Sequence, residues 1–79
     1  MRILFFATTR DLAGCDSANW NTDTEQTAES LWNWLSVRFP ALLPLKPSTR
    51  IARNGTWLMQ GELLQPGDEV ALLPPVSGG

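Results

Sequence analysis

The chain has 79 residues, enough for one small domain, and its 43% hydrophobic and 18% charged residues are typical of a globular protein. A net charge of −2 argues against nucleic-acid binding, which requires a basic surface. One Cys and no His exclude an intramolecular disulfide, a Cys/His zinc site and a Ser-His or Cys-His catalytic pair. No apolar run reaches transmembrane length, and we expect a cytoplasmic protein without metal, nucleic-acid or membrane partners.

The N-terminal part of the chain predicts a β-hairpin. Residues 3–9 form a β-branched and aromatic run, which predicts a strand with two apolar faces. Residues 10–14 predict a turn in which Gly14 can adopt a positive φ. Residues 15–21 predict a second strand, with a weaker signal because most of its residues are polar. We expect Cys15 to be a small buried residue and not a reactive thiol.

A helix follows the predicted hairpin. Thr27 is a suitable N-cap, Glu29 lies in the first turn, where the helix dipole favours an anion, and Pro40 disfavours helical geometry at the residue before it. Apolar residues recur at helical spacing and form one stripe, which we expect to face the core. Trp20 and Trp34 are expected at the rim, partly buried. The stripe consists of Ala28, Leu31, Trp32, Leu35 and Phe39.

The second half of the chain begins with a proline-rich segment and a hairpin. Residues 40–48 contain three prolines and predict a loop whose leucines cap the core. Asn54-Gly55 is the strongest short-range signal for a hairpin, because both residues tolerate a positive φ. The flanking strands are predicted at residues 49–54 and 56–59.

The last predicted strand covers residues 69–73. Before it, residues 61–67 predict a turn region with a short 3₁₀ element at residues 63–64, and residues 65–68 place Pro and Gly as a tight turn prefers. The adjacent carboxylates at 68–69 could resemble an acid/base pair. Neighbouring residues of a strand point to opposite faces, so a role in the turn and in solubility is preferred.

The element order β-β-α-β-β-β predicts an α+β fold, a single β-grasp or ubiquitin-like domain over residues 1–79. One main helix would lie across one face of a mixed five-stranded sheet. The first and last strands are the most hydrophobic, so we expect them side by side at the centre. No second helix remains to cover the other face, which would therefore expose apolar side chains. These side chains are Leu4, Phe6, Trp57 and Leu73.

The final residues predict a tail that can enter another protein. Pro74-Pro75 cannot donate backbone hydrogen bonds and favour a stiff, extended path. The segment 76–79 ends in Gly78-Gly79 and is expected to be flexible and thin, because glycine has no side chain. Such a tail can present its terminal carboxylate to another protein's active site. The alternative is an ordinary frayed terminus.

Residues 67–79 read Gly-Asp-Glu-Val-Ala-Leu-Leu-Pro-Pro-Val-Ser-Gly-Gly, and this segment closely resembles the end of the molybdopterin synthase small (sulfur-carrier) subunit. Residues 4–7, Leu-Phe-Phe-Ala, and residues 10–14, Arg-Asp-Leu-Ala-Gly, resemble the first strand and turn of that family. Asn54 in the hairpin matches as well. The resemblance spans the whole chain.

The resemblance implies a sulfur carrier. An E1-like enzyme would adenylate the carboxylate of Gly79 with ATP, and a sulfur donor protein would allow its conversion to a thiocarboxylate. The tail would then enter the active site of the large subunit and donate sulfur to the pterin precursor in molybdenum cofactor biosynthesis. Two small and two large subunits would form a heterotetramer. The chain itself would bind no cofactor, and the acid/base groups would come from the large subunit.

The candidate site residues form two groups. Gly79 carries the reacting carboxyl group, and Gly78 lets the tail pass without side-chain clashes. The open sheet face and the approach to the tail are expected to bind the partner, although ordinary core packing is the alternative for the apolar residues and a solvated turn cation for Arg10. The partner-binding candidates are Phe6, Arg10, Trp57, Leu73, Pro74, Pro75, Val76 and Ser77.

Three other functions remain open from the sequence. A thiamine-pathway sulfur carrier shares the fold and the Gly-Gly tail, but such chains are typically shorter and lack the Pro-Pro-Val-Ser approach. A ubiquitin-like modifier would join its tail to lysines through isopeptide bonds. A β-grasp binding module with an inert tail would carry no C-terminal modification.

Overall fold

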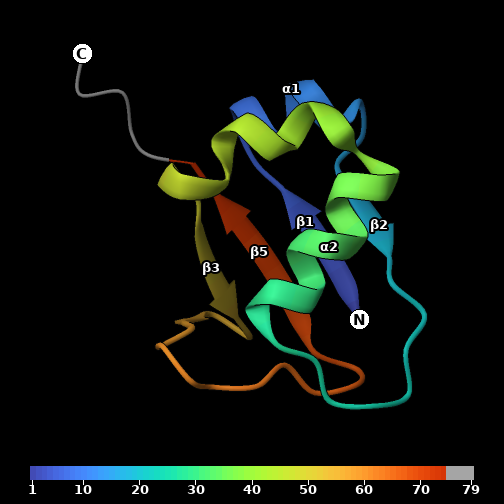
Figure 1. Ribbon diagram of the computed structural model, residues 1–79, viewed down its shortest axis with the longest axis vertical. Helices are drawn as coiled ribbons and strands as arrows, with labels where there is room; N and C mark the ends of the chain where they lie inside the picture. Colours follow the sequence, from blue (N-terminus) through green and yellow to red (C-terminus); the bar gives the residue numbers. More distant parts are fainter. Residues whose placement is uncertain (75–79) are drawn as a thin grey trace.

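A mixed five-stranded sheet forms the centre of the protein in the computed structural model, which describes residues 1–74 (Figure 1). The strand order is β2-β1-β5-β3-β4; β1 and β5 are parallel, and the other neighbours are antiparallel. The predicted pairing of the first and last strands is therefore confirmed. The strands are β1 (Arg2–Phe5), β2 (Ser17–Asn19), β3 (Arg50–Arg53), β4 (Thr56–Trp57) and β5 (Glu69–Leu73).

Helix α2 (Ala28–Arg38) crosses one face of the sheet, as predicted (Figure 1). The Thr27 hydroxyl accepts a hydrogen bond from the Ser30 N–H at 3.0 Å, and the Thr27 N–H donates to the Ser30 hydroxyl at 2.9 Å. This capping box satisfies backbone donors that the start of a helix leaves without partners. The helix ends before Phe39, because Pro40 disfavours a helical residue at that position.

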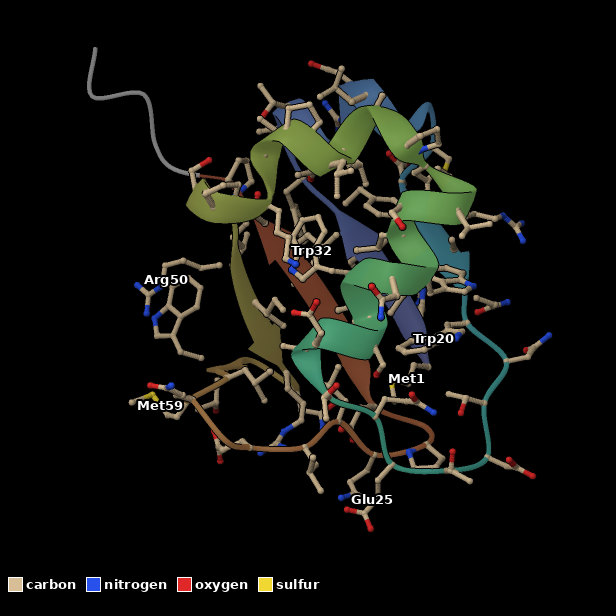
Figure 2. The ribbon with its side chains drawn as sticks, in the orientation of Figure 1. Met1, Trp20, Glu25, Trp32, Arg50 and Met59 are labelled. Atoms are coloured by element: carbon tan, nitrogen blue, oxygen red, sulfur yellow. The ribbon has the colours of Figure 1, made fainter. Side chains whose placement is uncertain are left out.

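The core lies between α2 and the sheet. Leu31, Trp32 and Leu35 of the predicted stripe are buried, whereas Val37 on the opposite side of the helix is 85% exposed. Figure 2 shows Trp32 near the middle of the molecule, where α2 overlies the sheet. The buried hydrophobic side chains that complete this cluster are Ile3, Phe5, Trp20, Leu42, Leu64, Val70 and Leu72.

An aromatic group extends the core towards β2. The prediction of a partly buried rim position holds for Trp34 but is wrong for Trp20, which is buried in the core. The two indole rings stack with their centroids 5.5 Å apart. Phe39 lies edge-on to Trp34 and to Phe5, with centroid distances of 6.2 and 5.1 Å. Trp20 is buried because a partner ring 14 residues further along the chain covers it, and local sequence does not show that contact.

The first strand is shorter than predicted, and the turn after it is a helix. β1 ends at Phe5, and the next element is the short helix α1 (Thr8–Ala13). The cause is Thr9, whose hydroxyl bonds to the backbone N–H and carbonyl of Phe6 and so turns the chain away from the sheet. Gly14 follows α1 with φ of 77°, which confirms the predicted positive φ.

Residues 40–48 are not a loop but a 3₁₀ helix, η1 (Pro40–Ser48). Pro40 stands at its start, where the missing N–H of proline would have no partner in any case. Leu42 is fully buried and caps the core, as predicted, whereas Leu43 is exposed. In Figure 1, η1 runs beside α1 at one end of the sheet.

The segment between β4 and β5 also differs from the prediction. Residues 63–64 form no 3₁₀ element. Instead, Leu64 exchanges two backbone hydrogen bonds with Gln26, of 2.8 and 2.7 Å, and buries its side chain completely. Burial of Leu64 under the entry to α2 therefore outweighs the local preference for a turn.

Both predicted tight turns are present. Asn54 and Gly55 have φ of 51° and 83°, the left-handed geometry that a two-residue turn between β3 and β4 requires. Gly67 has φ of 86°, and the Asp68 N–H donates to the Gln65 carbonyl at 3.1 Å, which closes the turn before β5. Within residues 1–74, no helix is long and apolar enough to cross a membrane.

Replacing Leu31 by alanine should lower the free energy of unfolding by about 2–5 kcal/mol, because the fully buried side chain would leave a cavity under α2. The matched control is Val37→Ala on the same helix, where the exposed position predicts a change within about 0.5 kcal/mol. Urea unfolding followed by tryptophan fluorescence measures both variants. An equal loss of unfolding free energy in both variants would contradict the placement of the apolar stripe against the core.

Candidate functional site

The face of the sheet opposite α2 carries an apolar groove of about 370 Å³. Phe6, Trp57 and Leu73, the predicted docking residues, all line it. Phe6 is 44% exposed and Trp57 is 42% exposed, so neither belongs to the core. That these residues bind a partner stays a prediction. The groove is lined by Leu4, Phe6, Ala52, Gly55, Trp57, Glu69, Ala71 and Leu73.

The strand register explains why this face is hollow. Ala52 of β3 lies opposite both Trp57 of β4 and Ala71 of β5. Ala71 in turn lies opposite Leu4 of β1. One row of side chains therefore crosses the sheet with a large residue at each end and two methyl groups between them. Methyl groups cannot fill the space between an indole and a leucine, so the row encloses a groove.

The floor of the groove is apolar, and its lining includes one carboxylate. Glu69 lies on the border, with its carboxylate 4.0 Å from the Arg2 guanidinium. Both side chains are more than half exposed, so this ion pair adds little to stability. Apart from Glu69, the described lining residues offer no acid, base or nucleophile. The groove therefore presents a mainly apolar surface of the kind that suits binding.

A strained turn holds Phe6 beside the groove. Ala7, which follows it, has φ of 52°, a value that residues with a side chain rarely adopt. Thr9 is fully buried; its hydroxyl accepts from the Phe6 N–H at 2.9 Å and donates to the Phe6 carbonyl at 2.6 Å. The same hydroxyl lies 3.3 Å from the Leu72 carbonyl of β5. Sequence analysis missed Thr9, although threonine is a residue type that bonds to nearby backbone in turns.

Trp57 contacts a cation that sequence analysis also missed. The guanidinium carbon of Arg50 lies 3.9 Å from the centre of the indole ring, a cation–π contact. Arg50 and Ala52 are two positions apart on β3, so both lie on the groove side of the sheet. Figure 2 shows Arg50 beside β3, at the edge of the molecule away from Trp20. Side chains of a strand point alternately to its two faces, and this alternation along β3 is the sequence signal that could have placed Arg50 on the same face as Trp57.

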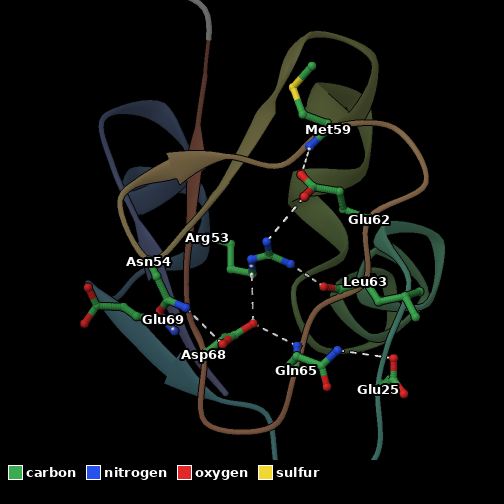
Figure 3. Close-up of polar contacts among 9 residues, drawn as sticks. All are labelled: Glu25, Arg53, Asn54, Met59, Glu62, Leu63, Gln65, Asp68 and Glu69. Atoms are coloured by element: carbon green, nitrogen blue, oxygen red, sulfur yellow. Dashed lines mark hydrogen bonds and ion pairs between the residues drawn. The ribbon is translucent and has the colours of Figure 1, made fainter.

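A polar network joins the hairpin that carries Trp57 to the start of β5 (Figure 3). Asn54, in the hairpin turn, donates from Nδ2 to the Asp68 carboxylate at 3.0 Å and accepts from the Glu69 N–H at 2.9 Å. Asp68 also accepts from the Gln65 N–H at 2.8 Å. Its carboxylate therefore serves the turn, which is the role preferred from the sequence.

Arg53 extends this network to the loop after β4 (Figure 3). Its guanidinium donates to the Leu63 carbonyl and lies 3.5 Å from the Glu62 carboxylate and 4.0 Å from that of Asp68. Glu62 in turn accepts from the Met59 N–H at 2.7 Å. The backbone on both sides of Trp57 is thereby fixed relative to β5.

The remaining predicted residues lie elsewhere. Arg10 lies on α1, outside the groove lining, with its Nε 3.9 Å from Asp16 Oδ1. Cys15 is half-buried and packs against the core. Among residues 1–74, no three His, Cys, Asp or Glu side chains are grouped as metal ligands would be. Pro74 directly follows β5, whereas Pro75, Val76, Ser77, Gly78 and Gly79 lie outside the described residues.

The sheet topology, the long helix across one face and the open apolar groove on the other define a β-grasp, ubiquitin-like domain. This architecture was the one predicted, with α1 and η1 as unexpected additions. The model of the ThiS family matches residues 3–79, and the chain belongs to this family.

Proteins similar to this chain match it over its whole length. The human molybdopterin synthase sulfur carrier subunit is 32% identical over 82 residues, covering 100% of this chain and 93% of the human protein. SAMP1 from Haloferax volcanii, a small archaeal modifier protein, superposes with a TM-score of 0.83 and 30% identity, over 99% of this chain and 97% of that one. A chain from the complex of subunits 1 and 2 of molybdopterin-converting factor from Helicobacter pylori superposes with a TM-score of 0.70 and 23% identity. The match covers 99% of this chain and 96% of that one.

Replacing Thr9 by valine removes the hydroxyl and keeps the shape of the side chain. We expect the free energy of unfolding to fall by about 1–3 kcal/mol, because the Phe6 N–H loses its acceptor. Thr8→Val, one position earlier and exposed, is the matched control and should change the value by less than about 0.5 kcal/mol. Thermal unfolding measures both. If both variants lower the free energy of unfolding by the same amount, the Thr9 hydroxyl does not hold the turn.

Proposed function

We propose that this chain is the sulfur-carrier subunit of a molybdopterin synthase, which supplies sulfur to the pterin precursor in molybdenum cofactor biosynthesis. The observation that carries the proposal is the open apolar groove at the base of the C-terminal segment. Leu73 both lines the groove and ends β5, so a protein docked there lies next to the point from which the chain continues to Gly79. Membership of the ThiS family and the name of the human relative support the proposal.

The partner that we propose for the groove is the large subunit of the synthase. Phe6 and Trp57 are exposed large apolar residues, and removing such surface from water favours association. The groove gives the partner a shape to fit, because its floor is lower than both of its sides. The complex of subunits 1 and 2 from Helicobacter pylori supports a partner of this kind. We further propose a heterotetramer of two carrier and two large subunits.

The chemistry that we propose takes place at the carboxylate of Gly79. A carboxylate is ionised at neutral pH and is a poor electrophile. An E1-like enzyme would join it to the AMP part of ATP, with release of pyrophosphate. Hydrosulfide supplied by a sulfur donor protein would then displace AMP, so that a C–S bond forms as the C–O bond to AMP breaks and a thiocarboxylate results. We further propose that this activation takes place in the cytoplasm.

The composition of the C-terminal segment suits delivery of the thiocarboxylate. Gly78 and Gly79 add no side-chain bulk to the part of the chain that would enter the large subunit's active site. The four residues 76–79 can span about 13 Å when fully extended. The carrier therefore supplies reach and docking, while acid/base groups are expected on the large subunit.

A ubiquitin-like protein modifier is the second candidate function, favoured by the likeness to SAMP1. Both functions begin with an adenylated Gly79 and differ in the atom that is finally bonded to its carbonyl carbon, which is sulfur in a carrier and a lysine nitrogen in a modifier. Mass spectrometry of the chain expressed with its activating enzyme separates them. Exchange of one oxygen for one sulfur supports a carrier, and isopeptide conjugates support a modifier.

Adding one alanine after Gly79 should abolish sulfur transfer. The terminal carboxyl group would then belong to the added alanine, and it would lie one residue too far along in the active sites of the activating enzyme and of the large subunit. The unfolding midpoint should stay unchanged. The measurement is molybdopterin formation by a synthase reconstituted from the two subunits, the activating enzyme, ATP and a sulfur source. Full activity of the extended chain without trimming would disprove the role of Gly79.

Replacing Trp57 by aspartate should weaken binding of the large subunit by about tenfold or more, because a charge would enter the apolar groove and a large contact would be lost. The matched control is Val37→Asp, which places the same carboxylate at an exposed apolar position on α2, across the sheet from the groove. Isothermal titration calorimetry measures both. An unchanged affinity for the Trp57 variant would remove the groove from the docking site.

A further inference from the structure

We propose that Arg50 is the polar anchor of the docking face and binds a carboxylate of the partner protein beside the apolar contact made in the groove. This inference rests on the proposed function, because it concerns the same partner and adds the chemistry by which that partner is recognised. A partner that fits would carry an Asp or Glu next to an apolar segment.

The position of Arg50 places its charge at one end of the groove. In the antiparallel pair of β3 and β5, Arg50 lies opposite Leu73, the last residue of β5. Leu73 lines the groove, and so does Trp57, over whose ring the Arg50 guanidinium lies. The cation therefore borders the apolar surface at the end where the chain leaves the sheet.

Arg50 also differs from the neighbouring arginines in its partners. Arg2 and Arg53 each have a carboxylate within 4.0 Å. Among residues 1–74, Arg50 has no such ion pair; its described contact is with the π-face of Trp57. A cation–π contact restrains a guanidinium without using its N–H donors, so these donors remain available to a ligand.

The chemistry of the anchor favours a carboxylate on a protein. The planar fork of guanidinium donors matches the two oxygens of a carboxylate, and a restrained fork loses less conformational entropy on binding. The apolar groove beside it would exclude water from the contact, which strengthens a charge-assisted hydrogen bond. Arginine and tryptophan are also the residue types most enriched where binding energy concentrates in interfaces.

The test compares two arginine deletions in binding to the recombinant large subunit from the same organism. Arg50→Ala should weaken binding by about 10- to 100-fold, whereas Arg38→Ala should change it by less than about twofold. Arg38 is a matched control, because it is an exposed arginine near an aromatic ring, 6.0 Å from the centre of Phe39, and lies at the end of α2. Arg50→Lys should fall between wild type and Arg50→Ala, because it keeps the charge and loses the fork.

A double-mutant cycle shows whether Arg50 acts directly or only by holding the indole ring. If Arg50 binds a carboxylate, Arg50→Ala still weakens binding in a Trp57→Leu background, and the affinity of the Trp57→Leu single variant falls with added salt more steeply than that of the double variant. If it acts only through Trp57, the double variant binds as Trp57→Leu does, and the inference is overturned.

The outcomes also separate this inference from the proposed function. If wild type binds the large subunit and the affinities of Arg50→Ala and Arg38→Ala are equal, Arg50 is not the polar anchor of the docking face, and the carrier role stands. If wild type does not bind the large subunit at all, the proposed function fails and the anchor fails with it. The unfolding midpoint of Arg50→Ala, expected to match wild type, shows that the variant is folded.

Discussion

The parallel pairing of β1 and β5 is the interaction on which the rest of the structure depends. It joins segments from opposite ends of the described chain and sets Ile3 beside Val70, both fully buried on the side of α2. The same register sets Leu4 beside Ala71 on the other face. Because successive strand residues face opposite sides, one pairing produces both the core and the groove, and a slip of one residue would exchange them.

The open face combines exposed apolar surface with rigid support. Thr9 fixes the turn that carries Phe6, and the strained backbone of Ala7 persists because this buried hydroxyl holds the neighbouring residue at two atoms. On the other side of the groove, Asn54 and Arg53 tie the hairpin of Trp57 to the turn before β5. The groove is therefore shaped before any partner arrives, which lowers the entropy lost on docking.

In the proposed function, this arrangement separates presentation of the reactive group from catalysis. The described residues of the groove are suited to recognition, and the proposed reactive group stands at the far end of a short segment that begins where β5 ends. In the proposed function, the carrier would be recognised by several proteins in turn, first for activation and then for sulfur delivery. The open face, with its apolar centre and a cation at one end, is the surface that we propose for docking.

The sequence by itself determined the features that depend on neighbouring residues. Thr27 and Pro40 define the limits of α2, Asn54-Gly55 defines the hairpin, and the apolar run at 69–73 defines β5, because caps, turns and strand periodicity are local properties. The resemblance of residues 67–79 to a known family came from the sequence in the same way, and membership of the ThiS family agrees with it.

Only the tertiary structure decided the features that depend on distant residues. Thr9 bends the chain into α1 next to Leu72, and Trp20 is buried because Trp34 covers it. The contact of Arg50 with Trp57, which we propose as part of the docking site, requires two strands to be paired in one register. Sequence patterns state which faces are apolar, but the packing of separate segments decides which residues meet there.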